Sequence, residues 1–188
     1  MAQPTRPAAP PWATWRDLGD ERLKLEFLGR EHSAGMFALW SSPEVVRHSG
    51  EVRDLGDQPV ELPARSAADS DRILEFFLPE HAGAERVRWA LIERRTGAFL
   101  GAIGFNAWRP RLELAFHLHP DHWGRGWMRA AAGQLLARLD EGDPRAVEAF
   151  AESANTRSTG LLQRLGFQAR EEQRDGATAF LRPPGGAA

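Results

Sequence analysis

Apolar and polar positions along this chain recur with two periods, one of two residues and one of three to four residues. Because side chains alternate between the faces of a strand, and a helix repeats about every 3.6 residues, the first period predicts strands and the second predicts helices. The predicted strands are residues 23–28, 87–92, 98–105, 111–119, 146–151, 167–174 and 177–182. The predicted helices are residues 31–40, 66–78, 126–141 and 155–165.

The order of these elements is strand, two helices, three strands, helix, strand, helix and two strands. Strands joined by short turns pair antiparallel, whereas the helix at residues 126–141 joins two strands that run parallel. We therefore predict an α/β (α+β) fold with a mixed, mostly antiparallel sheet of about seven strands, about four flanking helices and one central crossover.

The two ends of the chain differ in composition from its middle. Residues 1–20 are rich in Pro and Ala and are predicted to form a flexible arm, although Trp12 and Trp15 are costly to leave in water and should dock. Residues 21–182 are predicted to form a single domain, and residues 183–188 a loose tail. Residues 50–65 are predicted to be a long loop that contributes to a substrate site.

Composition excludes several classes of protein. The chain has 188 residues, which suits one domain, and its net charge of −2 provides no field for nucleic acid. It has no cysteine for disulfides or thiol chemistry and no tyrosine for proton donation. Neither a signal-like apolar segment nor an apolar run near ~18 residues is present, so we expect a cytoplasmic protein that contacts no membrane.

The stretch from residue 112 to residue 136 combines a strand, a turn with Gly124 and Gly126, and the start of a helix. The first amides of a helix lack intrahelical acceptors and carry partial positive charge, so this arrangement is an anion site. Glycine lets a phosphate approach the backbone closely. Neither the three-glycine dinucleotide fingerprint nor a P-loop lysine is present, so another phosphate ligand is indicated.

A second motif follows about thirty residues later, where Asn155 and Ser158 open a helix that ends in Leu165-Gly166-Phe167. Together with residues 123–128, Trp-Gly-Arg-Gly-Trp-Met, this motif resembles the GNAT superfamily of N-acetyltransferases, most closely its RimJ/RimL-type branch. The resemblance covers about residues 21–182. It implies a sheet splayed in the middle, acetyl-CoA (coenzyme A) as the cofactor, and acetyl transfer to a primary amine.

The resemblance also implies cofactor-binding residues. By the family's pattern, the pyrophosphate site comprises Trp123, Gly124, Arg125, Gly126, Trp127, Met128 and Arg129. Trp123 stands where the family has Gln or Arg, and Arg129 where this branch often has Glu, but contacts made by backbone amides survive such changes. The resemblance places the pantetheine beside Phe116 and Leu118 in the splay, with Asn155 as its hydrogen-bond partner. Asn155 also reads as an ordinary helix N-cap.

Catalytic roles follow from the same resemblance. Ser158 takes the place of the tyrosine that protonates the leaving thiolate in many relatives, and a backbone N–H near Leu118 is expected to bind the oxyanion. Glu113, which shares one strand face with His117 and His119, is our first choice for the general base. His117 is a further candidate and Glu152 is the runner-up. A metal at His117 and His119 is rejected because no third ligand has suitable spacing.

The acceptor amine is less determined. A protein N-terminal α-amine is the first expectation, a small amine such as an aminoglycoside or a polyamine is the alternative, and a catalytically silent acyl-CoA-binding module is a third reading. Acidic residues in the long loop either attract a cationic substrate or are simply solvated; they are Glu51, Asp54, Asp57 and Glu61. A monomer and a homodimer are both compatible with this pattern.

Overall fold

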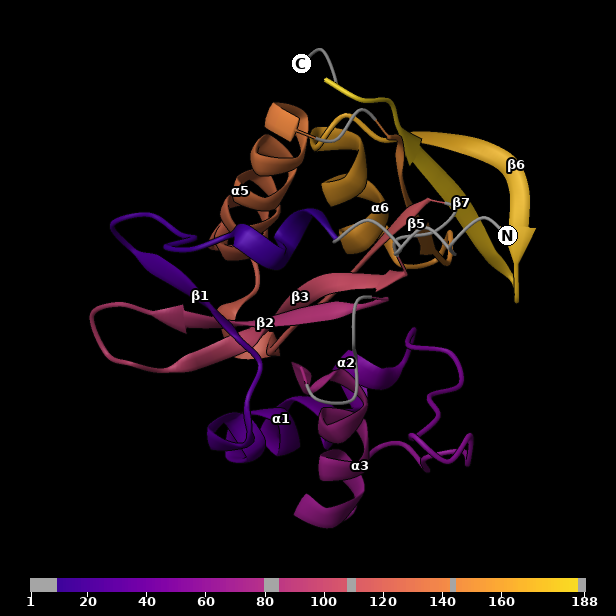
Figure 1. The fold of residues 1–188 in the computed structure, drawn as a ribbon. Coiled ribbons are helices and arrows are strands. Elements are labelled where there is room, and N and C mark those ends of the chain that lie inside the picture. The colour runs from indigo at the N-terminus through magenta and orange to yellow at the C-terminus, as the bar shows by residue number, and fades with distance from the viewer. Residues whose placement is uncertain (1–9, 80–84, 108–110, 143–144, 186–188) are drawn as a thin grey trace, which may run out of the picture.

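The structure, a computed structural model, describes residues 10–79, 85–107, 111–142 and 145–185. Seven strands form one sheet in the order β1-β2-β3-β4-β5-β7-β6, in which only the β4–β5 pair is parallel (Figure 1). The strands are β1 (Leu23–Phe27), β2 (Val87–Glu93), β3 (Phe99–Ala107), β4 (Leu112–Leu118), β5 (Val147–Ala151), β6 (Gln168–Arg174) and β7 (Ala177–Arg182). The predicted mixed, mostly antiparallel sheet is confirmed.

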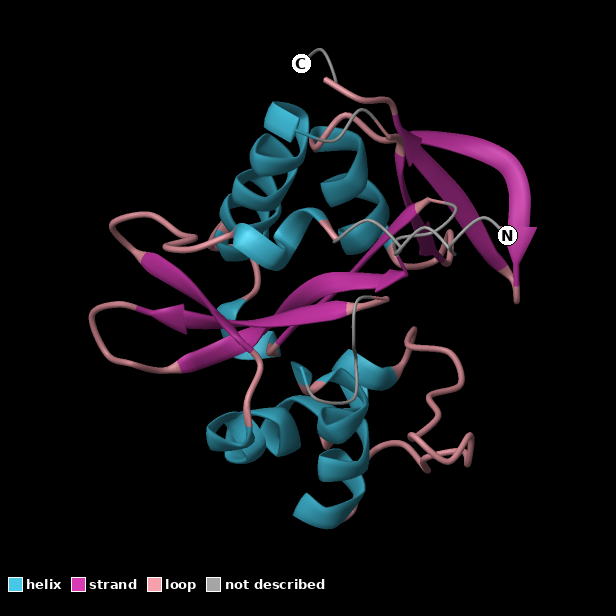
Figure 2. Cartoon of the chain, in the orientation of Figure 1, coloured by secondary structure: helices cyan, strands magenta, loops and turns pink. Residues whose placement is uncertain are grey.

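Helices cover both faces of this sheet, with α1, α2 and α3 on one side and α5 and α6 on the other (Figures 1 and 2). The helices are α1 (Ser33–Trp40), α2 (Pro43–Val46), α3 (Ala67–Phe77), α5 (Trp127–Gly142) and α6 (Thr156–Arg164). The sequence pattern missed α2, because Ser42-Pro43 was interpreted only as the end of the preceding helix. Proline at a first helical position has the φ angle that a new helix needs, and here it starts one.

Local capping and turn chemistry explain where the elements begin and end. The Ser66 side chain accepts the Asp69 amide while the Asp69 carboxylate accepts the Ser66 amide, and this reciprocal pair starts α3. Asp175 and Gly176 both have positive φ, 52° and 80°, which is the backbone of the tight turn that joins β6 to β7. The described part of the chain contains no helix long and apolar enough to cross a membrane.

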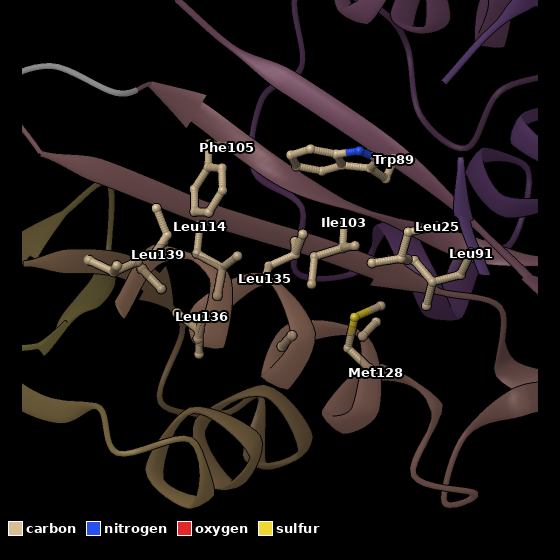
Figure 3. Close-up of a cluster of buried hydrophobic side chains, with 14 of the residues drawn as sticks. Leu25, Trp89, Leu91, Ile103, Phe105, Leu114, Met128, Leu135, Leu136 and Leu139 are labelled. Atoms are coloured by element: carbon tan, nitrogen blue, oxygen red, sulfur yellow. The ribbon is translucent and has the colours of Figure 1, made fainter. Parts of the chain in front are cut away.

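The larger core lies between the sheet and α5 (Figure 3). Leucines of α5 and apolar side chains of β2, β3 and β4 pack together there; they include Trp89, Ile103, Phe105, Leu114, Leu135, Leu136 and Leu139. Each of these side chains is at most 3% exposed. A second core on the opposite face joins α1 and α3 to the same strands. The central strands β2 and β3 are therefore buried on both faces.

Half of the predicted flexible arm packs onto the larger core. Trp12, at 4% exposure, stacks on Phe105 with 5.4 Å between ring centroids, and Trp15 stacks on Trp89 at 5.7 Å. Residues 1–9 lie outside the described residues. The two indoles dock as expected, because leaving two large aromatic surfaces in water would cost several kcal/mol, roughly 1.5–3 for each side chain. The described residues of the arm that include Trp12 and Trp15 are therefore part of the packed domain.

The parallel strands β4 and β5 pair only at their first residues. Leu112 lies opposite Val147 and Glu113 opposite Glu148, and no further pair follows. Beyond these pairs the two strands separate, as the resemblance implied. The β4–β5 gap, by which we mean the space between residues 115–118 and the end of β5, lies in the middle of the sheet.

Candidate active site

The backbone of β4 faces the β4–β5 gap with groups that β5 does not pair; one of them, the Leu118 carbonyl, accepts the Trp123 indole N–H. The His119 amide donates to the Leu100 carbonyl at 2.9 Å, so the odd-numbered residues of this segment direct their backbone groups toward β3. By alternation, the N–H and C=O groups of Phe116 and Leu118 point into the gap. An extended chain with amide groups can pair with them there, which is what the pantetheine arm of coenzyme A offers.

The glycine turn forms the second part of the site. Gly124 and Gly126 have φ angles of 72° and 78°, which strongly favour glycine, and a Cβ added at either would meet no atom within 4 Å. The first amide of α5 with a helical acceptor is that of Ala130, which donates to the Gly126 carbonyl at 3.0 Å. In the described part of the chain, no backbone carbonyl accepts the amides of Trp127, Met128 or Arg129. The turn therefore has open space at both glycines and is followed directly by three unpaired N–H donors.

Side chains of the turn divide into buried and exposed groups. Trp127 and Met128 are 6% and 5% exposed and belong to the larger core, so only their backbone faces an anion. Arg125 and Arg129 are exposed and available to phosphate. Arg22 lies 4.2 Å above the Trp127 ring and donates to the Arg125 carbonyl at 3.4 Å, which ties β1 to the turn.

Trp123, the departure from the family pattern, has a defined role in the structure. Its indole N–H donates to the Leu118 carbonyl at 2.8 Å, and the Arg157 guanidinium lies 4.3 Å from its ring centroid. Trp123 therefore connects the end of β4 to the first turn of α6. The contact also holds a cation, Arg157, next to the glycine turn, where the family pattern has its own Gln or Arg.

Asn155 and Ser158 begin α6. The Asn155 side-chain oxygen accepts the Ser158 amide at 3.2 Å, which confirms the N-cap reading. The Asn155 side-chain amide and the Ser158 hydroxyl make no hydrogen bond that the described residues account for, so both remain available to a ligand. The cap and the ligand role that the resemblance implied are thus compatible with each other.

Glu113, predicted as the first choice for the base, is engaged by two donors. Asn106 Nδ2 and Arg174 Nη1 both lie 2.9 Å from its carboxylate oxygens. The paired carboxylate in turn raises the pKa of Arg174. Because both donors occupy oxygens of the Glu113 carboxylate, its role as base stays a prediction that this geometry disfavours.

His117 and His119 share a strand face as predicted, but their surroundings differ. Burial, together with the positive charge of Arg88, lowers the pKa of His117 to about 3, so this ring is neutral at pH 7. It lies against the Trp40 ring, with 4.6 Å between centroids. His119 instead accepts the Asp121 amide at 3.4 Å and caps the short turn after β4. Neither histidine is placed as a strong base.

The acceptor side of the gap also holds residues that the sequence pattern did not identify. His48 Nδ1 lies 2.6 Å from a Glu152 carboxylate oxygen, and Ser49 Oγ lies 3.4 Å from His117 Nε2. His48 and Ser49 follow α2, whose presence the pattern missed, and nothing in their local sequence marks them. Only the folded chain brings them to the end of β5.

The acidic residues of the long loop are paired with arginines. Glu51 and Asp57 contact Arg53, at 2.6 Å and 3.5 Å. Asp54 contacts Arg72 at 2.6 Å, and Glu61 contacts Arg65. Each negative charge therefore has a positive neighbour, and the described loop forms no acidic patch that would attract a cation. The described residues also contain no group of three or more His, Asp or Glu side chains placed to hold a metal ion.

Comparison with known proteins agrees with this geometry. The profile of the family described as Acetyltransferase (GNAT) domain matches residues 22–168. The chain is 26% identical over 165 residues to the N-acetyltransferase p20 of Bacillus licheniformis, itself described as uncharacterized. That match covers 84% of this chain and 85% of p20.

Solved structures share the fold. RimL, a ribosomal L7/L12 alpha-N-protein acetyltransferase in complex with coenzyme A, matches with a TM-score of 0.69 at 15% identity, over 87% of this chain and 95% of that one. An acetyltransferase of Salmonella typhimurium that modifies the N-terminal serine of 50S ribosomal subunit protein L7/L12 matches with a TM-score of 0.68 at 16% identity, over 87% and 96%. The predicted resemblance to the RimJ/RimL-type branch is confirmed at the level of the fold.

Proposed function

The chain belongs to the GNAT acetyltransferase family, and from that premise we propose that it acetylates the N-terminal α-amine of a protein or peptide. GNAT acetyltransferases use acetyl-CoA, the acetyl donor. The observations that carry the proposal are the β4–β5 gap, into which the backbone of Phe116 and Leu118 points, and the unpaired amides that begin α5.

We propose that the backbone amides of Trp127, Met128 and Arg129 bind the pyrophosphate, with Arg125 and Arg157 adding charge. Phe116 and Leu118 pair with the pantetheine amides, and the Asn155 side-chain amide donates to the same arm. The amides of Trp127, Met128 and Arg129 have no backbone acceptor in the described chain, whereas the Leu118 carbonyl already accepts the Trp123 indole N–H and would have to share or exchange that bond.

In the chemical step the thioester carbonyl needs a hydrogen-bond donor, and the leaving sulfur needs a proton. The Leu118 N–H, which points into the gap, is positioned to donate to the developing oxyanion. The Ser158 hydroxyl, at the first turn of α6, is positioned to pass a proton to the sulfur. Because a thiol of this kind has a pKa near ~8.5, it leaves readily as a thiolate and needs only modest assistance.

Two arguments favour an α-amine over a small polycation. An α-amine has a pKa near ~7.8, so roughly a third of it is neutral at pH 7.4, whereas a lysine-like amine is neutral about once in a thousand molecules. The four acids of the loop are paired with three arginines, so they leave only one negative charge in excess for an aminoglycoside or a polyamine. RimL, which shares the fold, is a ribosomal-protein α-N acetyltransferase.

The test combines acetyl-CoA titration calorimetry with a thiol-release assay. The acceptor panel comprises short peptides with free N-terminal Ser, Ala or Met, the same peptides with blocked N-termini, spermidine and one aminoglycoside. We expect turnover on at least one free-amine peptide and none on its blocked form. Turnover on spermidine or the aminoglycoside alone would replace the proposed acceptor, and tight acetyl-CoA binding without turnover on any amine would establish a silent binding module.

A further inference from the structure

Two consecutive residues, His48 and Ser49, reach both rims of the β4–β5 gap. The His48 ring contacts Glu152 just after β5, at 2.6 Å, while Ser49 contacts His117 on β4, at 3.4 Å. The two contacts join segments that are 104 and 68 residues apart in the chain. The segment after α2 therefore spans the gap.

The strand register shows where this span lies. The last β4–β5 pair is Glu113 opposite Glu148, and continuing the count by four residues along each strand places Glu152 level with His117. Val147, Ala149 and Ala151 are buried in the core under α5, so Glu152 belongs by alternation to the opposite face. His117, which contacts Trp40 of α1, lies on that same face.

The span thus lies on the face away from the glycine turn and α5. The proposed cofactor site uses α5, α6 and the edges of the strands, so an acetyl group carried into the gap would meet its acceptor from the other face. His48, Ser49, His117 and Glu152 are the polar side chains that the structure gathers there at one level of the sheet.

The His48–Glu152 pair has the chemistry of an oriented base. A carboxylate can only accept, so Nδ1 carries the hydrogen and Nε2 keeps its lone pair. Nε2 has no hydrogen-bond partner in the part of the chain that the structure describes. The Glu152 carboxylate at Nδ1 holds the ring in one orientation, as the carboxylate does in a Ser-His-Asp triad.

The alternative bases on this face are weaker candidates. Glu113 accepts from Arg174 and Asn106, and burial lowers the pKa of His117 to about 3. The charged and titratable groups known to face the span are Glu152, from the end of β5, and His117, with Arg88 acting on the latter. Of the two imidazoles at the span, His48 is thus the one that has a carboxylate partner.

We propose that His48, oriented by Glu152, accepts the proton of the attacking amine; this assignment rests on the proposed function. An ammonium group gives one proton to His48 Nε2 and becomes a neutral amine. Its lone pair forms the C–N bond while the carbonyl electron pair moves to oxygen. That electron pair then re-forms the carbonyl as the C–S bond breaks. The nitrogen loses its second proton, which passes through Ser158 to the sulfur. His48 finally releases the proton that it accepted to water.

The test measures kcat/KM against pH for full-length wild type, His48→Gln and Glu152→Gln, using the free N-terminal peptide that the wild type acetylates fastest. For His48→Gln we expect a loss of about 100-fold at pH 6.5, since positioned proton transfer contributes about 10²–10⁴-fold. The loss should shrink to less than about 10-fold at pH 9, where most of an α-amine is already neutral. Glu152→Gln keeps an acceptor for Nδ1 but removes the charge, so about a 10-fold loss is expected.

Glu141→Gln is the matched control, because Glu141 pairs with Arg138 at the far end of α5, away from the span, and should keep full activity. Calorimetry should give the same acetyl-CoA affinity for all four proteins. A His48→Gln rate within about threefold of wild type at pH 6.5, or a loss that does not change with pH, would overturn the assignment. If His48→Gln does not fold, an unchanged Glu152→Gln profile overturns it equally. An absence of wild-type turnover on every amine defeats the proposed function itself.

Discussion

The two faces of the β4–β5 gap are built in different ways. On the α5 face the groups that await a ligand are backbone amides, and the side chains of Trp127 and Met128 turn into the core. On the opposite face the polar groups are side chains contributed by distant segments, such as His48 and Glu152. A site made of backbone tolerates substitution, which explains how Trp123 can replace a Gln or Arg. In a site made of side chains, substitutions change the chemistry directly, so the residues there can differ between enzymes that use different acceptors.

We call the α5 face of the gap, where the proposed ligand groups are backbone amides, the backbone-built face, and the opposite face the side-chain-built face. The largest expected effect on the backbone-built face comes from Gly126→Val. Gly126 has a φ of 78°, and this left-handed conformation costs a non-glycine residue roughly 1–2 kcal/mol, more if it is β-branched. The added side chain would also stand where a phosphate approaches. We expect acetyl-CoA to bind about 30-fold more weakly, measured by calorimetry.

Gly133→Ala on the same helix is the control for that substitution. Gly133 lies in the interior of α5, and a Cβ there meets no atom within 4 Å. Alanine should therefore stabilise the protein by about 0.5–1 kcal/mol and leave acetyl-CoA affinity unchanged. Equal affinities for Gly126→Val and wild type would show that the turn does not bind the cofactor. The α5 face would then not be a cofactor site made of backbone.

Ser158→Ala tests the place where the two faces meet. The hydroxyl is predicted to assist the departing sulfur, while the capping bond that involves Ser158 uses only its backbone amide and would survive. We expect kcat to fall about 10-fold, below the usual range of about 10²–10⁴-fold for proton transfer because the thiol is acidic, with acetyl-CoA affinity unchanged within about twofold. Stopped assays for kcat and calorimetry for affinity separate the two quantities. Unchanged kcat would remove Ser158 from the mechanism.

Much of the fold and of the backbone-built face was predictable from the sequence, because the signals there are local. Strand alternation, the Ser66–Asp69 cap and the Asp175-Gly176 turn each operate within a few residues. Gly124 and Gly126 mark the turn that we propose to bind phosphate for the same reason: a positive φ limits which residues can stand there.

The side-chain-built face was not predictable, because its contacts join segments far apart in the chain. The ion pair of Glu113 with Arg174 spans 61 residues, and neither residue type signals it. The His48–Glu152 contact depends on α2, which begins at the Ser42-Pro43 pair that also ends α1. The loop acids illustrate the same limit, since their arginine partners, such as Arg72 for Asp54, are set by packing.

A smaller effect is expected from Arg157→Ala. This substitution measures how much one side chain adds to the acetyl-CoA affinity of a site made mainly of backbone amides. Arg157 lies over the Trp123 ring, on the first turn of α6. Losing one partly exposed cation near a phosphate should weaken acetyl-CoA binding about 5-fold at low salt and less at high salt. Calorimetry at two salt concentrations measures this. A salt-independent loss would instead indicate that Arg157 acts by holding Trp123 in place.

The smallest effect concerns stability on the acceptor face, through His117. Its pKa in the folded protein is about 3, below the ordinary 6.5, so between these values the unfolded chain binds a proton that the folded chain does not. The free energy of unfolding should therefore fall as the pH drops through 6.5 and be unaffected by this residue above it. His117→Gln removes that dependence.

From pH 7 to pH 5, urea denaturation should show the wild type losing up to about 2 kcal/mol more than His117→Gln, a limit that applies if the ring stays neutral in the folded state. Carboxylates contribute little in this window because they titrate mostly below it, near ~4. Parallel pH dependences for the two proteins would mean that the ring gains a proton while folded. His117 would then be able to accept a proton at the gap, and the assignment of that role to His48 alone would no longer follow from the structure.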